Sequence, residues 1–186
     1  MLDHILKEHK ESILALWVEA IFEAFPPDSS RFLKSVKDPF RNPIGQTFKR
    51  SAEILYDCLV AGEQSEQLDE ALEQAVRIRA VQDCKASQAV AFVFLLKKCV
   101  RTVLVGRGVK YSETELVEFE DRIDGLALEA FDRFMSAKER IFAIQAQETK
   151  RRTYKLLERL GDSVGKKRFS PGGPSIDKKD SVRGTG

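Results

Sequence analysis

Side chains that could carry acid–base or ligand chemistry are few in this chain. Histidine, the usual general base and haem or metal ligand near neutral pH, occurs only as His4 and His9. Because these two positions are five residues apart, they do not share one face of a helix well. We predict that both are solvated surface residues. A haem held by a histidine inside a helical bundle is disfavoured, because no histidine follows residue 9.

The other reactive groups have no partner at a useful spacing. Cys58, Cys84 and Cys99 lie far apart and form neither a zinc knuckle nor a redox dithiol, so we expect free thiols in a reducing compartment. Cysteine-ligated haem is a minor alternative. The carboxylates of 66–73 and 113–124 lack the Glu-x-x-His pairing of di-iron bundles, which predicts solvated helix faces. We therefore expect a protein that is not an enzyme, with no metal and no cofactor.

Two arginines lie at a helix junction that could hold an anionic ligand. Arg77 and Arg79, with Lys85, surround the break before a long apolar run. Ion pairing with acids such as Asp83, or with the helix end, is the favoured alternative. Core packing is likewise favoured over a ligand cavity for the aromatic residues Trp17, Phe22, Phe25, Phe40, Phe92, Phe94 and Phe131. Arg77, Arg79 and Phe92 are kept as candidate ligand or partner contacts.

Charge is divided unevenly along the chain, although the net charge is only +2. The residues before Lys150 include 20 basic and 25 acidic ones, whereas 11 basic and 4 acidic ones follow from Lys150 onward. Few aromatic residues interleave with the basic ones, which disfavours nucleic-acid binding. Contact with a partner protein is the favoured interpretation, and the candidate partner-binding residues are Lys150, Arg151, Arg152, Tyr154 and Lys155.

The elements that must position these residues are helices. Apolar residues recur at steps of three and four, and no segment alternates like a strand, which predicts an all-α fold of about six helices. Start signals stand at Asp3, residues 28–30, Asn42-Pro43, Ser65, Ser87, and Ser112 with Glu115 as a capping box. Stop signals stand at Pro26-Pro27, Asp38-Pro39, Gly62, the segment 83–86 and Gly106-Arg107-Gly108. The continuous apolar run 89–96 predicts a central helix.

The last helix is expected to run from Ser112 to about Leu160. At that length it would span on the order of 70 Å, so its far end must leave the core or bend. We expect a domain over 1–147, a projecting helix end over 148–160 and a disordered basic tail over 161–186. No export signal is apparent and the longest apolar region is too short and too charged for a membrane span, which predicts a cytoplasmic protein.

A set of short motifs in a fixed order resembles one known family. The motifs are Trp17 with Ala20, Phe25-Pro26-Pro27, the segment 38–43, the segment 77–82, Ser87-Gln88-Ala89 with 92–97, and Ala130-Phe131-Asp132-Arg133. Together they resemble the N-terminal domain of the RsbR-type antagonists of the stressosome, the RsbRD N-terminal domain. The resemblance covers roughly residues 10 to 150.

This resemblance implies a globin-like helical fold without haem, usually a homodimer, that serves as a sensory or interaction module. The relatives with several domains continue into a STAS domain, whereas this sequence is expected to be a stand-alone copy. The leading hypothesis is a regulatory module that acts through an unidentified protein partner. A small-molecule sensor with a pocket between helices is one alternative. Another, implied by stand-alone copies in anaerobic sulfate reducers, is an accessory protein of a redox complex for sulfite reduction.

Overall fold

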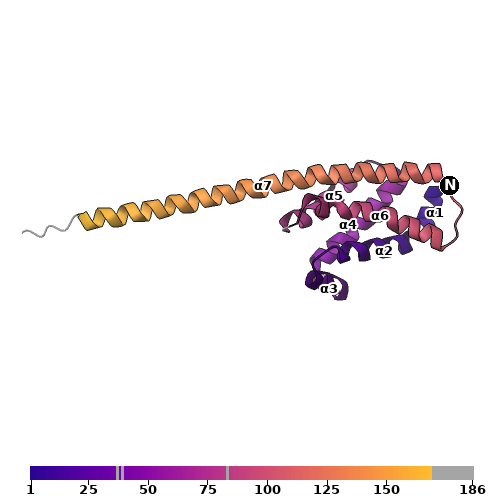
Figure 1. Ribbon diagram of the computed structural model, residues 1–186, viewed down its shortest axis with the longest axis horizontal. Coiled ribbons are helices and arrows are strands. Elements are labelled where there is room, and N and C mark those ends of the chain that lie inside the picture. The colour runs from indigo at the N-terminus through magenta and orange to yellow at the C-terminus, as the bar shows by residue number, and fades with distance from the viewer. Residues whose placement is uncertain (37, 39, 83, 169–186) are drawn as a thin grey trace, which may run out of the picture. The chain divides into compact units, whose positions relative to one another are not determined.

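Seven helices form the described part of the chain, and no strand occurs among the described residues. The computed structural model describes residues 1–36, 38, 40–82 and 84–168, with side chains to residue 159. The chain divides into two units, Met1–Phe142 and Ala143–Gly186, described separately below. In order, the helices (Figure 1) are α1 (Leu2–Glu8), α2 (Lys10–Glu23), α3 (Pro27–Ser35), α4 (Pro43–Ala61), α5 (Glu66–Val81), α6 (Ala86–Gly106) and α7 (Glu113–Arg168). The predicted all-α fold with a long last helix is confirmed.

Helix boundaries signalled by short-range capping residues are where the sequence predicts them. Asn42 Oδ1 accepts a hydrogen bond from the Gly45 amide at 2.9 Å, and Pro43 is the first residue of α4. Ser65 Oγ accepts from the Leu68 amide at 3.2 Å at the start of α5. Gly62 ends α4 with φ 69°, a left-handed conformation that favours glycine. These caps act within a few residues, so local sequence suffices to locate them.

The first predicted helix is interrupted at His9, which separates α1 from α2 and raises the number of helices from about six to seven. The Tyr56 hydroxyl of α4 donates to the Leu6 carbonyl at 2.8 Å. In an uninterrupted helix that carbonyl would accept from the amide of Lys10. A side chain from another helix thus occupies the backbone acceptor at the break, a recognised cause of helix bending.

Several predicted caps are replaced by other residues. Helix α6 begins at Ala86, before Ser87, and the Gln88 side chain accepts from the Lys85 amide at 3.1 Å. Ser87 is therefore inside the helix and is not its cap. Helix α1 likewise begins at Leu2, and its amide donates to the Glu115 carboxylate of α7 at 3.0 Å. Glu115 thus caps a different helix, while the Ser112 half of the predicted capping box remains, at 3.4 Å.

Helix α3 also starts earlier than predicted. Pro26 is its N-cap residue and Pro27 is its first helical residue. The predicted caps at 28–30 therefore lie in its first turn. Asp3 similarly lies in the first turn of α1 and pairs with Arg122 at 3.6 Å. Acidic residues are favourable in a first turn because they face the positive end of the helix dipole.

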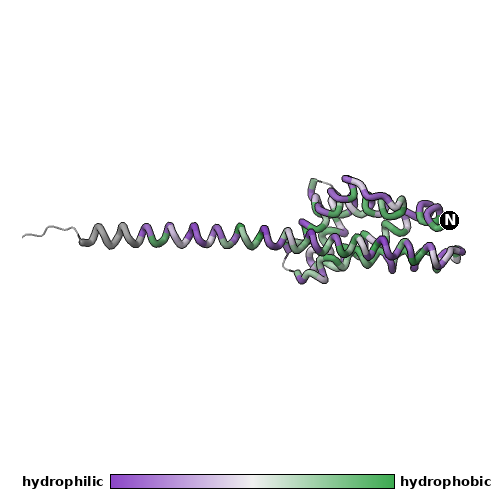
Figure 2. The backbone as a smooth tube through the Cα atoms, turned by 90° about the horizontal axis from the view of Figure 1, so that it is seen from above, coloured by the Kyte–Doolittle hydropathy of each residue, from purple (hydrophilic) through white to green (hydrophobic). Residues whose placement is uncertain are grey.

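The core of the Met1–Phe142 unit is built around α6, which packs against α2 and α5. Hydrophobic and hydrophilic residues alternate along the helices (Figure 2), as expected where each helix buries one face. Trp17 of α2 is fully buried, and its indole N–H donates to the Phe92 carbonyl of α6 at 2.7 Å. Phe94 on the same helix is exposed, so the run 89–96 is not buried all round.

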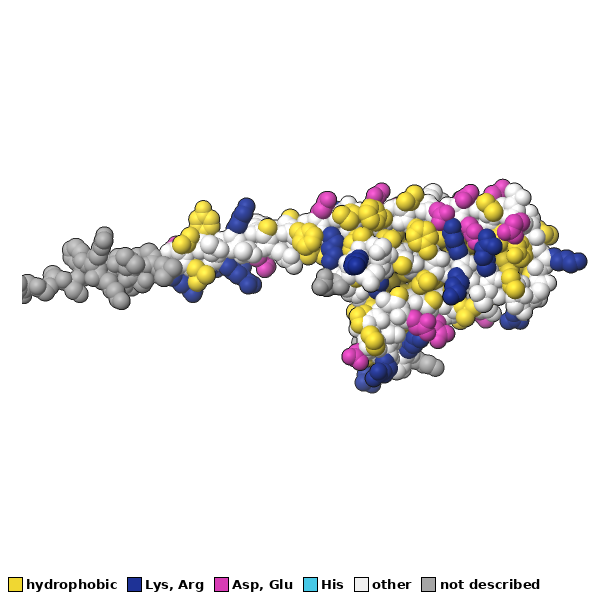
Figure 3. All heavy atoms as spheres, in the orientation of Figure 1, with side chains coloured by type: hydrophobic (Ala, Val, Ile, Leu, Met, Phe, Trp, Pro, Cys, Tyr) yellow, Lys and Arg dark blue, Asp and Glu magenta, His cyan; other side chains and the backbone are white. Residues whose placement is uncertain are grey.

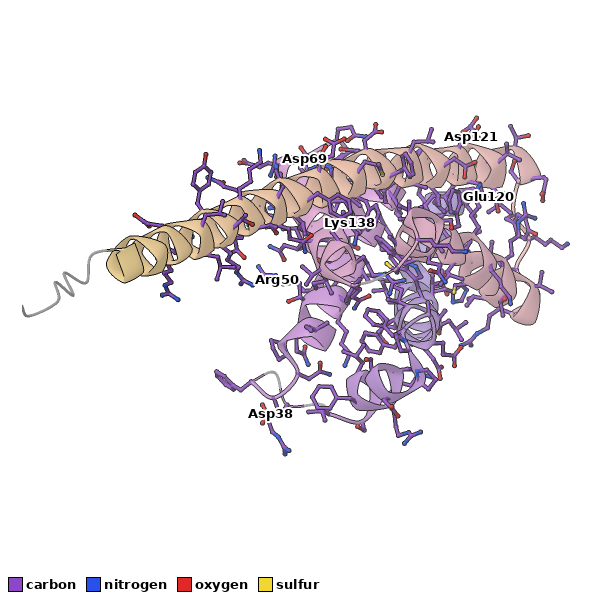
Figure 4. All side chains as sticks on the ribbon, turned by 60° about the vertical axis from the view of Figure 1, so that its left-hand side comes forward. Asp38, Arg50, Asp69, Glu120, Asp121 and Lys138 are labelled. Carbon is purple, nitrogen blue, oxygen red and sulfur yellow. The ribbon has the colours of Figure 1, made fainter. Side chains whose placement is uncertain are left out.

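Helix α7 is held to this unit by one buried face and by ion pairs. Its buried residues recur mostly at steps of three and four: Leu116, Phe119, Ile123, Leu126, Ala127, Ala130 and Phe134. Arg101 of α6 contacts Glu120 at 2.6 Å, and Lys97 contacts Asp124 at 2.6 Å. Arg133 pairs with Asp69 of α5. Figure 4 labels Asp69 and Glu120. The pairs of Arg101 with Glu120 and of Lys97 with Asp124 place α6 and α7 in an antiparallel register.

The second unit, Ala143–Gly186, is helical to Arg168, so α7 does not end near Leu160. Every side chain described here, from 143 to 159, is exposed. The Thr149 and Thr153 hydroxyls donate to carbonyls one turn earlier, at 2.9 and 3.0 Å. The remainder of the predicted disordered tail, residues 169–186, lies outside the described residues.

Candidate functional site

A buried arginine at the end of α5 is the most unusual charged residue of the Met1–Phe142 unit. Only 3% of the Arg79 surface is exposed. Its guanidinium carbon lies 4.6 Å from the centre of the Phe25 ring, a cation–π contact. Nη1 donates to Gln82 Oε1 at 3.1 Å and Nη2 donates to the Gln88 carbonyl at 2.8 Å. Both acceptors are neutral, so these contacts do not neutralise the charge.

Arg79 also lines a pocket between the end of α2, the start of α3 and the junction of α5 with α6. The pocket has a volume of about 580 Å³. Its other lining residues are Ala24, Phe25, Pro26, Ser29, Gln82, Cys84 and Gln88. The walls thus combine an apolar floor with amide, hydroxyl and thiol groups, a composition that suits a small polar ligand.

Two positive groups lie beside this pocket. Lys138 of α7 donates to the Gln82 carbonyl at 3.1 Å, which places a second cation beside the lining residue Gln82 (Figure 4). Helix α6 begins at Ala86, two residues before the lining residue Gln88. The positive end of its dipole therefore faces the same region. Burial lowers the pKa of Arg79, because removing water disfavours its charged form.

The three candidate contacts that the sequence suggests are not brought together. Arg77 points to solvent and pairs with Glu73, one turn earlier on α5, at 2.8 Å. Phe92 is buried and stacks edge-on against Phe48, with ring centres 6.2 Å apart. Phe48 stacks in the same way against Phe25 at 5.6 Å. Phe92 is therefore linked to the pocket through two intervening rings, and only Arg79 of the three lines it.

An exposed apolar stripe on α7 was not singled out from the sequence. Leu128, Phe131 and Met135 follow each other at steps of three and four, and Leu128 is 69% exposed. Phe94 of α6 is also exposed and lies level with Leu128 in the register that the ion pairs set. Hydrophobic side chains are visible over this part of α7 in Figure 3. The sequence does contain a pattern that could have identified this stripe: a second set of apolar residues on α7 recurs at steps of three and four, in addition to the buried set.

The candidate partner-binding residues lie in the second unit and are all exposed: Lys150, Arg151, Arg152, Tyr154 and Lys155. Of these, Arg152 has an ion pair within its own helix, with Glu148 at 3.8 Å. Leu156 and Leu157 follow and are exposed as well. This part of α7 therefore presents cations together with aromatic and aliphatic side chains.

Among the described residues, no three His, Cys, Asp or Glu side chains gather in a way that could hold a metal ion. No described helix combines the length and the hydrophobicity needed to cross a bilayer.

Comparison with known proteins identifies a family that this chain matches. Neither the curated proteins nor the solved structures include a match to this chain. One protein family matches residues 11–149, and its description is the RsbT co-antagonist protein rsbRD N-terminal domain. The match covers most of the chain, including the pocket around Arg79 and the apolar stripe on α7. The chain therefore belongs to this family of regulatory sensory domains.

Proposed function

We propose that the protein is a haem-free sensory and regulatory module that acts by binding a partner protein through residues 148–160. The observation that carries the proposal is the exposure of every described side chain from 148 to 159, in a segment with four cations at 150–155. Exposed aromatic and arginine residues are the types most enriched where proteins bind each other. Membership of a regulatory family supports an output of this kind.

Charge reversal in this segment tests the proposal. Affinity capture from the native host with the full chain as bait should retain a partner, measured by quantitative mass spectrometry. Lys150→Glu, Arg151→Glu and Arg152→Glu together should reduce the captured partner about tenfold, since three exposed pairs contribute about 0.5 kcal/mol each. The matched control reverses three exposed cations elsewhere, Arg107, Lys110 and Arg140. Equal capture by both triple variants would refute the assignment.

We further propose that the protein is a homodimer through the apolar stripe formed by Leu128, Phe131, Met135 and Phe94. On α1 and α2, only Leu16 is an exposed large hydrophobic residue, at 38%, whereas the stripe gathers four such residues on α6 and α7. A row at steps of three and four on an antiparallel helix pair can pack against its own copy across a twofold axis.

A double variant, Leu128→Asp with Phe131→Asp, should convert the dimer to a monomer of 21.1 kDa. Both side chains are exposed, so the helical circular dichroism of the variant should be unchanged. Native mass spectrometry measures the result. Phe40→Asp, at a residue that is 96% exposed in another part of the chain, is the control and should remain dimeric. A wild type that is monomeric at micromolar concentration, or a double variant that stays dimeric, would contradict the proposal.

Small-molecule sensing is the second function that a specific observation favours. A cation that is almost fully buried lines a pocket of about 580 Å³. A ligand in that pocket would contact the turn between α2 and α3 and the junction of α5 with α6 at once. Its binding would therefore stabilise the arrangement of four helices.

A further inference from the structure

We propose that the pocket lined by Arg79 is an anion site that binds a small organic carboxylate. This inference deepens the sensory part of the proposed function by naming the class of ligand. It begins from the hydrogen bonds of the guanidinium, which has five N–H groups. Nη1 and Nη2 donate to neutral oxygens of Gln82 and Gln88, whereas the buried Nε has no acceptor among the described residues.

A buried cation needs a counter-charge to offset the loss of water. No described carboxylate makes an ion pair with Arg79, and none of the described lining residues is acidic. Other arginines of the same unit differ in this respect, since Arg101 pairs with Glu120 and Arg133 pairs with Asp69. A ligand carboxylate in the pocket would supply a counter-charge that the described residues do not provide, and it could accept two parallel hydrogen bonds from the guanidinium.

The walls restrict what such an anion can be. Phe25, Pro26 and Ala24 form an apolar side against which a short hydrocarbon part can pack, and Ser29, Gln82 and Gln88 offer hydrogen-bonding groups. A volume of about 580 Å³ accommodates a small metabolite. The start of α6 and Lys138 add positive potential without adding a competing carboxylate.

The chain contains its own reporter of occupancy. Cys84 is half-buried and lines the pocket, and its Sγ donates to the Arg79 carbonyl at 3.5 Å. Cys58 is also half-buried but lies at the end of α4, where it lines other pockets. An occupant should therefore shield Cys84 from alkylation and leave Cys58 unaffected. The neutral reagent iodoacetamide avoids a direct electrostatic effect of the anion on the reagent.

The test measures alkylation rates of Cys84 and Cys58 by mass spectrometry in the full chain, with benzoate and with its neutral counterpart benzamide at equal ionic strength. Benzoate at ten times its dissociation constant should slow Cys84 alkylation about tenfold. Cys58 should react at an unchanged rate, and benzamide should protect neither thiol. Asp83 stands between the lining residues Gln82 and Cys84 in the sequence but lies outside the described residues, so Asp83→Asn is measured in parallel to remove a carboxylate that could compete.

Substitutions then locate the charge that holds the anion. Arg79→Met should abolish protection by benzoate, but it changes a buried residue and can unfold the chain. Ser29→Glu keeps the core intact, because Ser29 is exposed, and should abolish protection by placing a carboxylate in the pocket. Ser35→Glu adds the same charge to α3 at a residue that does not line the pocket, and should leave protection unchanged.

The proposal is overturned if benzoate protects Cys84 in neither the wild type nor Asp83→Asn, if benzamide protects equally, or if Ser29→Glu leaves protection unchanged. Partner capture through residues 148–160 uses different residues and a different measurement. Failure of the anion site would therefore leave the result of the capture experiment standing, and the reverse also holds.

Discussion

Replacing Trp17 with alanine is expected to lower the free energy of unfolding by about 3–5 kcal/mol, as deletion of a fully buried aromatic side chain usually does. The indole fills the space between α2 and α6 and is completely buried. The substitution also removes the hydrogen bond to the Phe92 carbonyl. Urea denaturation followed by circular dichroism measures the effect.

Two further variants separate packing from hydrogen bonding at this residue. Trp17→Phe keeps most of the ring and should cost less, about 1–2 kcal/mol, mainly from the lost hydrogen bond and a smaller cavity. Leu16→Ala, at the neighbouring exposed residue, should change the stability by about 0.5 kcal/mol or less. A Trp17→Ala variant as stable as Leu16→Ala would show that α2 is not packed on α6 in the way described.

Replacing Asn42 with alanine is expected to cost about 2–4 kcal/mol, well above the effect of an ordinary helix cap. This side chain is only 1% exposed and makes three hydrogen bonds. Its Nδ2 donates to the carbonyls of Leu33 and Val36, at 3.0 and 2.9 Å, while Oδ1 caps α4. The substitution would leave buried backbone groups of two helices without partners.

Asn42→Asp provides the informative comparison, because it keeps the cap acceptor and loses the two donors. If the link to α3 matters, this variant should be destabilised nearly as much as Asn42→Ala. Gly45→Ala should also be destabilising, since a Cβ at Gly45 would lie 2.8 Å from Asn42 Cγ. Thr47→Ala, whose hydroxyl bonds only to the Pro43 carbonyl of its own helix, is the control with little expected effect. Calorimetric unfolding of the four variants distinguishes a cap from a bridge between helices.

The parts of the fold that could be predicted are those decided by neighbouring residues. Asn42-Pro43, Ser65 and Gly62 act on backbone groups within one turn, so their roles are readable without tertiary information. The break at His9 could not be predicted, because the residue that occupies the Leu6 carbonyl is Tyr56, 50 residues away. The role of Glu115 could not be predicted for the same reason, since its carboxylate accepts a hydrogen bond from the Leu2 amide, 113 residues away in the sequence.

In the candidate site, too, the sequence predicts single residues but not the contacts between distant segments. Sequence identified Arg79 but grouped it with Arg77, which lies two residues away and therefore on nearly the opposite side of α5. The pocket depends on Phe25 and Pro26 meeting the α5–α6 junction, a contact that no spacing in the sequence encodes. The apolar stripe on α7 was overlooked because two apolar faces coexist on that helix, and periodicity does not say which one is buried in the core.

The contacts between aromatic residues connect the tryptophan, a natural fluorophore, to the pocket. Trp17 is the only tryptophan of the chain, and its hydrogen bond ends on Phe92, whose ring leads through Phe48 to Phe25 and the guanidinium of Arg79. Its fluorescence therefore comes from one buried environment and requires no label. A shift of the Phe25 ring on occupation of the pocket would reach the indole through two edge-on stacks. Emission wavelength and lifetime are therefore expected to report occupation of the pocket.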